Sequence, residues 1–107
     1  MQLQPVYISN GAKQPAIKQG YYITPVFAVH WETDESDIGW GVTHVPTGMS
    51  AGRKIKQWED AVELASMLSA VPGAETGEFA DSTSMTPEVL MNLGTVYNEF
   101  KHKHPYV

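Results

Sequence analysis

Residues 38–49, IGWGVTHVPTGM, predict a β-strand that runs into a tight turn, and the rest of the chain is organised around them. Proline suits the first corner of a type I turn and glycine its exit, so residues 46–48 predict a hairpin whose second strand covers residues 50–55. Side chains alternate along a strand. One face of the first strand would therefore carry Trp40, Val42 and His44, and the other Gly41, Thr43 and Val45.

A first hairpin is predicted near the amino terminus. Residues 3–9 form its first strand, and Pro5 places that strand at a sheet edge, where a missing N–H does no harm. Asn10-Gly11 favours the positive φ angles of a two-residue turn. Residues 12–17 would therefore return along the first strand.

The strongest strand signal covers residues 21–31, which are rich in aromatic and β-branched residues. They predict one long strand that is bulged at Pro25. The acidic segment 32–37 connects it to the strand that contains Trp40, so the chain predicts an antiparallel meander of about four to five strands. The core face of the long strand would carry Tyr21, Ile23, Phe27, Val29 and Trp31.

Apolar residues recur at helical spacing further along the chain. Residues 58–71 predict an amphipathic helix, which proline and glycine then end. Residues 73–85 are small, polar and acidic, and predict a mobile connection rather than a structured element. Thr86 is a good N-cap, so a second helix is predicted over residues 86–101, with a frayed end over 102–107.

The composition fits one α+β domain over residues 1–107, with its sheet within residues 3–55. Hydrophobic residues make up 42% of the chain and charged residues 18%, which gives enough apolar surface for a core. The absence of cysteine excludes disulfides and thiolate chemistry. The net charge of −5 disfavours proteins that wrap long nucleic acids. No apolar run approaches a membrane span and no leader pattern opens the chain, so we expect a protein that is soluble and not exported.

No catalytic motif is present, so the sequence predicts no catalytic residue and no cofactor. The serines lack a G-x-S-x-G context, and the glycines lack a phosphate-loop pattern. His30 and His44 could face one another across neighbouring strands as half of a zinc site, but no spacing suggests the remaining ligands. We therefore expect histidines that pack and hydrogen-bond, with no metal centre. An enzyme would have to use His30, His44 and an acid.

The aromatic residues are the main candidates for an interaction surface. One amphipathic helix covers only one sheet face, so at least one ring should stay exposed or pack in a partner chain. An exposed aromatic patch would be an interface, because monomers seldom leave such a patch uncovered. Close in the chain, basic residues would let the same rings form a stacking platform for single-stranded nucleic acid. The candidate interaction surface consists of Tyr21, Tyr22, Trp31, Trp40 and the acidic residues Asp34, Glu35 and Asp37, and the candidate nucleic-acid contacts are Arg53, Lys54 and Lys56.

Residues 39–48, GWGVTHVPTG, with the short basic strand and the helix beginning Asp60-Ala61, resemble small uncharacterised proteins encoded by bacteriophages. In those proteins a W-x-V-T-H-x-P-T-G strand and turn precede a D-A helix. The resemblance covers about residues 21–71 and departs from the pattern at Lys56-Gln57, where Thr or Ser would cap the helix. It implies an accessory factor that grips a host protein in the cytoplasm of a bacterial host cell, and no catalytic residue. The order of meander and helix is also similar, at the level of fold alone, to the Whirly-type single-stranded DNA-binding fold, in which paired chains present a curved sheet.

Two functional hypotheses follow. The first is a small non-enzymatic interaction protein, a phage accessory factor that binds and modulates a host or phage protein as an inhibitor or defence antagonist. The alternative is a dimeric single-stranded nucleic-acid-binding protein of Whirly-like architecture. A homodimer is open in both, because the helix over residues 86–101 can pack on its own sheet or on a neighbouring copy.

Overall fold

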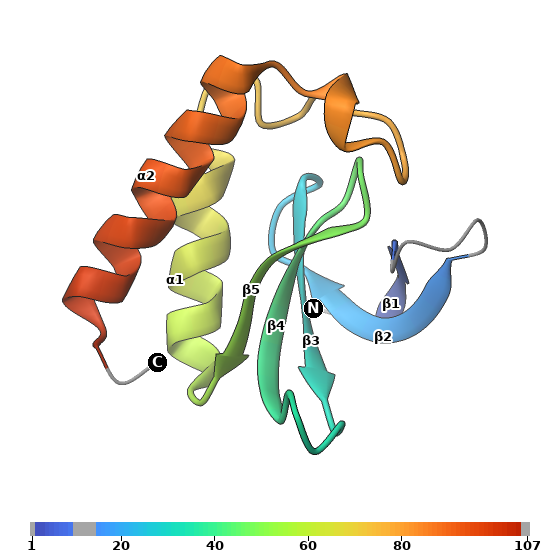
Figure 1. Ribbon diagram of the computed structural model, residues 1–107. Coiled ribbons are helices and arrows are strands. Elements are labelled where there is room, and N and C mark those ends of the chain that lie inside the picture. The colour runs from blue at the N-terminus through green and yellow to red at the C-terminus, as the bar shows by residue number, and fades with distance from the viewer. Residues whose placement is uncertain (1, 10–14, 106–107) are drawn as a thin grey trace.

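Five strands precede two α-helices in the computed structural model, which describes residues 2–9 and 15–105 (Figure 1). Neighbours in the sequence are neighbours in the sheet, in the order β1-β2-β3-β4-β5, and each pair is antiparallel. The predicted α+β meander followed by two helices is confirmed. The strands are β1 (Gln4–Ile8), β2 (Ala16–Tyr22), β3 (Phe27–Glu32), β4 (Gly39–His44) and β5 (Met49–Ile55).

The β4–β5 hairpin forms where the sequence places it. Gly48 leaves the turn with φ of 71°, a conformation that favours glycine, and its N–H donates to the carbonyl of His44 at 2.8 Å. At the other end of the sheet, β1 is an edge strand, so Pro5 lies where the sequence predicts. The predicted turn at Asn10-Gly11 and residues 12–14 of the predicted returning strand lie outside the described residues.

The prediction of one long strand over residues 21–31 is wrong. The chain reverses between Tyr22 and Phe27, so the segment contributes the end of β2 and nearly all of β3. Pro25 lies within this reversal, and because it has no N–H it could not have donated to the ladder of a continuous strand. Thr24 completes the reversal, because its hydroxyl oxygen accepts the N–H groups of Val26 and Phe27, each at 3.2 Å.

The helices are α1 (Trp58–Ser69) and α2 (Pro87–Lys103). Thr86 caps α2, since its side chain accepts the N–H of Val89 at 3.3 Å. Gln57 makes no side-chain cap bond at the start of α1, where Thr or Ser would be a better cap. The predicted frayed end is wrong at residues 102–104, because α2 continues to Lys103 and the next residue, His104, lies 2.7 Å from a carboxylate oxygen of Glu63 on α1.

The connection between the helices is structured, so the prediction of an unstructured segment over residues 73–85 is wrong. It contains the 3₁₀ helix η1 (Ser82–Ser84), whose N-cap Asp81 accepts the N–H of Thr83 at 2.9 Å. The N–H of Ala80 donates to the carbonyl of Thr47 at 2.9 Å, which ties the connection to the β4–β5 turn.

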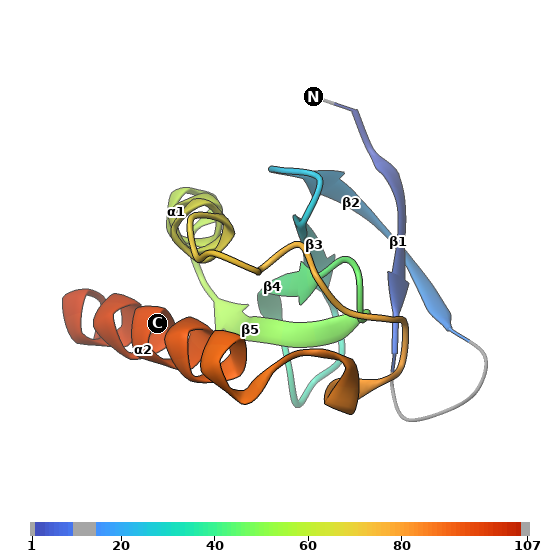
Figure 2. The same ribbon diagram turned by 90° about the horizontal axis from the view of Figure 1, so that it is seen from above.

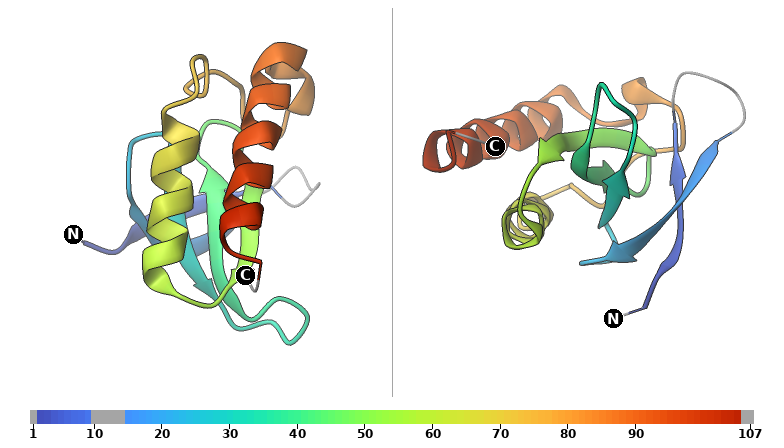
Figure 3. Two further views of the ribbon diagram at one scale, coloured as in Figure 1. Left: turned by 90° about the vertical axis from the view of Figure 1, so that its left-hand side faces the viewer. Right: turned by 90° about the horizontal axis from the view of Figure 1, so that it is seen from below.

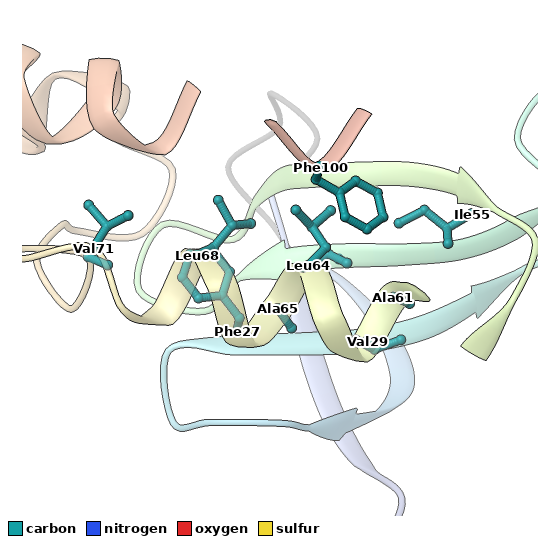
Figure 4. Packing of buried hydrophobic residues seen from close by; sticks show 11 residues of the cluster. Phe27, Val29, Ile55, Ala61, Leu64, Ala65, Leu68, Val71 and Phe100 are labelled. Carbon is teal, nitrogen blue, oxygen red and sulfur yellow. The ribbon is translucent and has the colours of Figure 1, made fainter. Parts of the chain in front are cut away.

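The core lies between α1 and one face of the sheet (Figure 4). Alternating residues of β3 and β4 supply the sheet side, as their periodicity predicts. Phe100 of α2 closes the core from the second helix and is fully buried. The strands and α1 contribute Phe27, Val29, Val42, Ile55, Ala61, Leu64, Ala65 and Leu68.

The opposite sheet face curls around a smaller interior. Figure 2 shows both helices on one side of the molecule, with β1 and β2 curling away on the other. The N–H of Ser9, just after β1, donates to the carbonyl of Gly48 in the β4–β5 turn at 2.8 Å, so the two ends of the meander meet. Val6, 1% exposed, and Gly20 are buried inside this curl.

Candidate functional site

Four aromatic rings form a continuous row at one end of the sheet. The ring centroids of Tyr21 and Trp58 lie 5.2 Å apart, those of Trp58 and Trp40 5.0 Å, and those of Trp40 and Trp31 5.1 Å. All three pairs are edge-to-face, the geometry that aromatic quadrupoles favour. We call Tyr21, Trp58, Trp40 and Trp31 the aromatic row. Trp58, the first residue of α1, is the one member that the sequence did not identify as a candidate for the interaction surface.

The row leads from the core to the surface. Tyr21, Trp40 and Trp58 are partly buried, whereas Trp31 is 46% exposed. Trp31 lies on the same face of β3 as the buried Val29, because residues two apart on a strand share a face. The predicted core face therefore contains an exposed tryptophan at the point where α1 no longer covers it.

The same sheet face continues uncovered over β1 and β2. Tyr7 and Ile17 are paired across these strands and are 48% and 58% exposed. Ile17 shares its face of β2 with Tyr21 of the aromatic row, because the two are four residues apart. The helix α1 packs mainly on β3, β4 and β5. We call Tyr7, Ile17 and Trp31 the apolar sheet patch.

Tyr22 does not join this surface. It follows Tyr21 directly on β2, so its side chain leaves the opposite face of the sheet. Its hydroxyl donates to the carbonyl of Pro5 at 2.8 Å and links the two strands. The structure therefore brings together three of the four predicted aromatic residues and separates the fourth.

The acidic loop between β3 and β4 is held in part by its own side chains. Asp34 accepts the N–H and the hydroxyl of Ser36 at 3.0 and 2.8 Å, and these hydrogen bonds hold the pKa of the Asp34 carboxyl below its usual range. Asp34 and Glu35 are exposed. Asp37 turns toward β5, where Oδ2 lies 3.8 Å from Nη1 of Arg53. The predicted acidic surface is thus two exposed residues beside one that is partly enclosed.

The predicted nucleic-acid contacts collect with a residue pair from α2. Arg53, Lys54 and Lys56 line one surface hollow together with Tyr97 and Lys101. Four of the chain's seven lysine and arginine residues therefore meet at one place in a protein of net charge −5. Tyr97 is the aromatic lining residue of this hollow, and no member of the aromatic row lines it. Sequence reasoning missed the α2 pair, although a spacing of four residues places both on one helix face.

A buried polar chain crosses the inner face of the curled sheet. Nε2 of His30 lies 2.7 Å from the hydroxyl of Thr43, and Nδ1 lies 2.8 Å from Oε1 of Glu32 without a well-directed hydrogen bond. The other oxygen of Glu32 pairs with Nζ of Lys18 at 3.0 Å. Burial lowers the pKa of His30, and the opposing attraction of Glu32 is the smaller effect. The imidazole is therefore held neutral at pH 7.

This chain has the order hydroxyl, imidazole, carboxylate that nucleophilic enzymes use. An attacking hydroxyl must reach its substrate, but Thr43 is 1% exposed and His30 is 5% exposed. Both residues line a hollow of about 240 Å³ together with Glu32 and Asp37, and Oδ1 of Asp37 is buried without a hydrogen-bond partner. The contact between His30 and Thr43 links β3 to β4.

His44 lies on the other face of the sheet, so the two histidines do not face one another. It pairs in register with Phe27, whereas His30 pairs with Gly41. Nε2 of His44 donates to the carbonyl of Ala74 at 2.6 Å, which leaves Nδ1 to accept from the hydroxyl of Thr47 at 2.7 Å. Burial lowers the pKa of His44 as well. No group of three or more potential metal ligands occurs among residues 2–9 and 15–105.

Comparison with known proteins adds no relative: no protein-family model, curated protein or solved structure matches the chain. In the described part of the chain, no helix combines the length and the apolar character needed to cross a membrane.

Proposed function

We propose that this chain is a small non-enzymatic interaction protein that binds and modulates a bacterial or phage protein. The observation that carries the proposal is the apolar sheet patch, in which Trp31, Tyr7 and Ile17 are 46%, 48% and 58% exposed on one sheet face. Exposed apolar patches on small proteins commonly mark interaction sites. Tryptophan and tyrosine also carry a large share of the binding energy in protein interfaces.

The aromatic row restricts the side chain of Trp31 in the apolar sheet patch. Trp31 contacts Trp40, which contacts Trp58 at the start of α1, so one side of the exposed Trp31 ring packs against other rings. Such a ring loses little side-chain entropy when a partner covers it. The low exposure of Thr43 and His30, 1% and 5%, supports a non-catalytic role, because an attacking hydroxyl must contact its substrate. Phage origin, an inhibitory or defence-antagonist role and a place in the host cytoplasm come from the resemblance over about residues 21–71.

Affinity capture from bacterial lysate tests the proposal. The wild-type chain should recover a stoichiometric partner that Trp31→Ala and Ile17→Ser each lose, while both variants remain folded by circular dichroism. Met91→Ala is a matched control, because Met91 is 68% exposed and lies on α2. Recovery of the same partner by the Trp31 and Ile17 variants would contradict the use of this patch. Charge reversal at Asp34 and Glu35 then tests whether the acidic loop contributes.

The alternative of a dimeric single-stranded nucleic-acid-binding protein has one specific observation in its favour. Arg53, Lys54, Lys56 and Lys101 meet beside Tyr97, which offers cations and a ring at one hollow. Titration of labelled oligonucleotides at 50 and 200 mM salt, with sedimentation to define the oligomer, tests it. Binding that weakens steeply with salt would support this function. No binding at 50 mM salt would remove it.

A further inference from the structure

A groove runs along the outer edge of β5, between that strand and α2. Figure 3 shows α2 lying alongside β5. At the Met49 end the groove deepens into a pocket of about 260 Å³ with Phe27 and Leu68 among its lining residues. Ala51 from β5 and Leu93 from α2 also line it. This end of the groove is therefore apolar and reaches the core.

The groove changes character toward the other end of β5. Tyr97 lines the apolar pocket and also the hollow that contains Arg53, so the two are parts of one groove. Beyond Arg53 the lining contains Lys54, Lys56 and Lys101, and its one carboxylate, Asp37, lies 3.8 Å from Arg53, so cations are in excess there. One strand length thus separates an apolar pocket from most of the protein's positive charge.

The edge of β5 is open on the groove side. Within residues 2–9 and 15–105, β5 pairs with β4 and no strand pairs with its outer edge. An unpaired edge offers backbone N–H and carbonyl groups to an added strand, and proteins often shield such edges with a helix. Here the shielding is incomplete, because α2 has one buried residue, Phe100, while Leu90 beside the groove is 45% exposed.

We infer that this groove binds an extended peptide segment of a partner protein, which adds to β5 as a further strand. An apolar side chain of the peptide enters the pocket at the Met49 end, and acidic side chains meet Lys54 and Lys56 about one strand length away. Backbone pairing supplies affinity in this mode and the pockets supply specificity. An apolar pocket and an open strand edge suit a peptide better than a nucleic acid, and charge complementarity requires that the peptide be acidic at one end. The apolar sheet patch is a separate surface, so this inference stands without it.

Selection from a random peptide library tests the inference and does not require a purified partner. A displayed library of seven-residue segments, matching the length of β5, is sorted against the intact protein. We expect enrichment of peptides with one large apolar residue and at least two acidic residues toward one end. The strongest enriched peptide is then synthesised and titrated by fluorescence anisotropy.

Variants locate the binding. Lys54→Gln with Lys56→Gln should weaken binding about ten-fold, since each exposed ion pair contributes a few-fold. The matched control is Gln2→Glu with Ser66→Glu, which changes the net charge by the same two units at exposed residues that line no part of the groove and should leave affinity unchanged. Trp31→Ala should also bind normally. Alternate N–H groups of an added strand point toward β5 and away from it. Of two peptides methylated at the two alternate sets of backbone nitrogens, one should therefore lose binding and the other should keep it.

Three results would overturn the inference. The first is a library that yields no enriched peptide, or peptides without acidic residues. The second is an enriched peptide whose binding the Gln2 and Ser66 control weakens as much as the Lys54 and Lys56 variant does. The third is preferential binding of a labelled single-stranded oligonucleotide that displaces the peptide, which would assign the cationic end to nucleic acid.

Discussion

Removal of the Trp40 ring should reduce the free energy of unfolding by about 3 kcal/mol. Replacement of a buried aromatic residue by alanine costs about 3–5 kcal/mol. Trp40 is partly rather than fully buried, which places the loss at the lower end of that range. About 1–3 kcal/mol of the loss comes from its two edge-to-face contacts, with Trp31 and Trp58, at about 0.5–1.5 kcal/mol each.

Trp31→Ala is the matched comparison. Trp31 makes one of these ring contacts and is 46% exposed, so its loss should cost about 1 kcal/mol. The difference of about 2 kcal/mol corresponds to a factor of roughly 30 in the unfolding equilibrium constant. Trp40→Phe, which keeps a smaller ring, should fall between the two alanine variants.

Urea unfolding followed by far-ultraviolet circular dichroism measures these differences without relying on tryptophan fluorescence. With a denaturant slope of about 1–3 kcal/mol per M, the midpoint for Trp40→Ala should fall by about 1–3 M. An equal or smaller loss for Trp40→Ala than for Trp31→Ala would refute the reasoning. It would mean that the contact of Trp40 with Trp58 adds no stability beyond its contact with Trp31.

Three further predictions concern the histidines, two glycines and α2. Burial lowers the pKa of His30 and His44, so protonation favours the unfolded chain. The free energy of unfolding should therefore fall as the pH drops below about 6.5, by up to about 1.4 kcal/mol per pH unit for each histidine. Urea titrations at pH 7.5, 6.5 and 5.5 measure this fall, which His44→Gln should reduce, and a free energy of unfolding that is flat or rises toward pH 5.5 would contradict the prediction. A Cβ at residue 41 would lie 2.8 Å from Cε1 of His30, whereas none of the surrounding atoms is within 4 Å of a Cβ at residue 94 of α2. Gly41→Ala should therefore lower stability by about 1–3 kcal/mol and Gly94→Ala raise it by about 0.5–1 kcal/mol, so two thermal melts that shift in the same direction would be inconsistent with the structure. Phe100→Ala should cost about 3–5 kcal/mol and speed hydrogen exchange across α2, because Phe100 anchors that helix in the core; α2 amides that remain as protected as in the wild-type chain would show that other contacts hold the helix.

The sequence determined the order and type of most elements because the signals for them are local. Alternation around Trp40, the turn at residues 46–48 and the helical spacing after residue 57 each concern side chains close together in the chain. Thr86 and Pro87 likewise define the start of α2 through the adjacent backbone. The prediction of one strand over residues 21–31 was wrong for a local reason too. Thr24 and Pro25 form a reversal, but the residues around them have the composition of a strand.

Surfaces and partners within the fold depended on register and on contacts distant in sequence. Alternation placed His30 and His44 on faces of their own strands, but the pairing of His30 with Gly41 decided that the two faces are opposite, since a shift by one residue reverses a face. The connection after α1 is structured partly by its own Asp81 cap and partly by contacts with the distant residues His44 and Thr47, which no local composition encodes.

The candidate sites show the same division. Composition alone identified Tyr21, Tyr22, Trp31 and Trp40 as surplus aromatic residues, and alternation placed Tyr21 and Trp31 on one face of the single strand that the sequence predicted. Alternation also placed Tyr22 on the face opposite to Tyr21. Only the tertiary structure added Trp58 to the row and left Trp31 at the limit of the cover that α1 provides. Periodicity therefore decides which face a side chain takes, while exposure is decided by how far a packed helix extends across that face, a property of the whole chain.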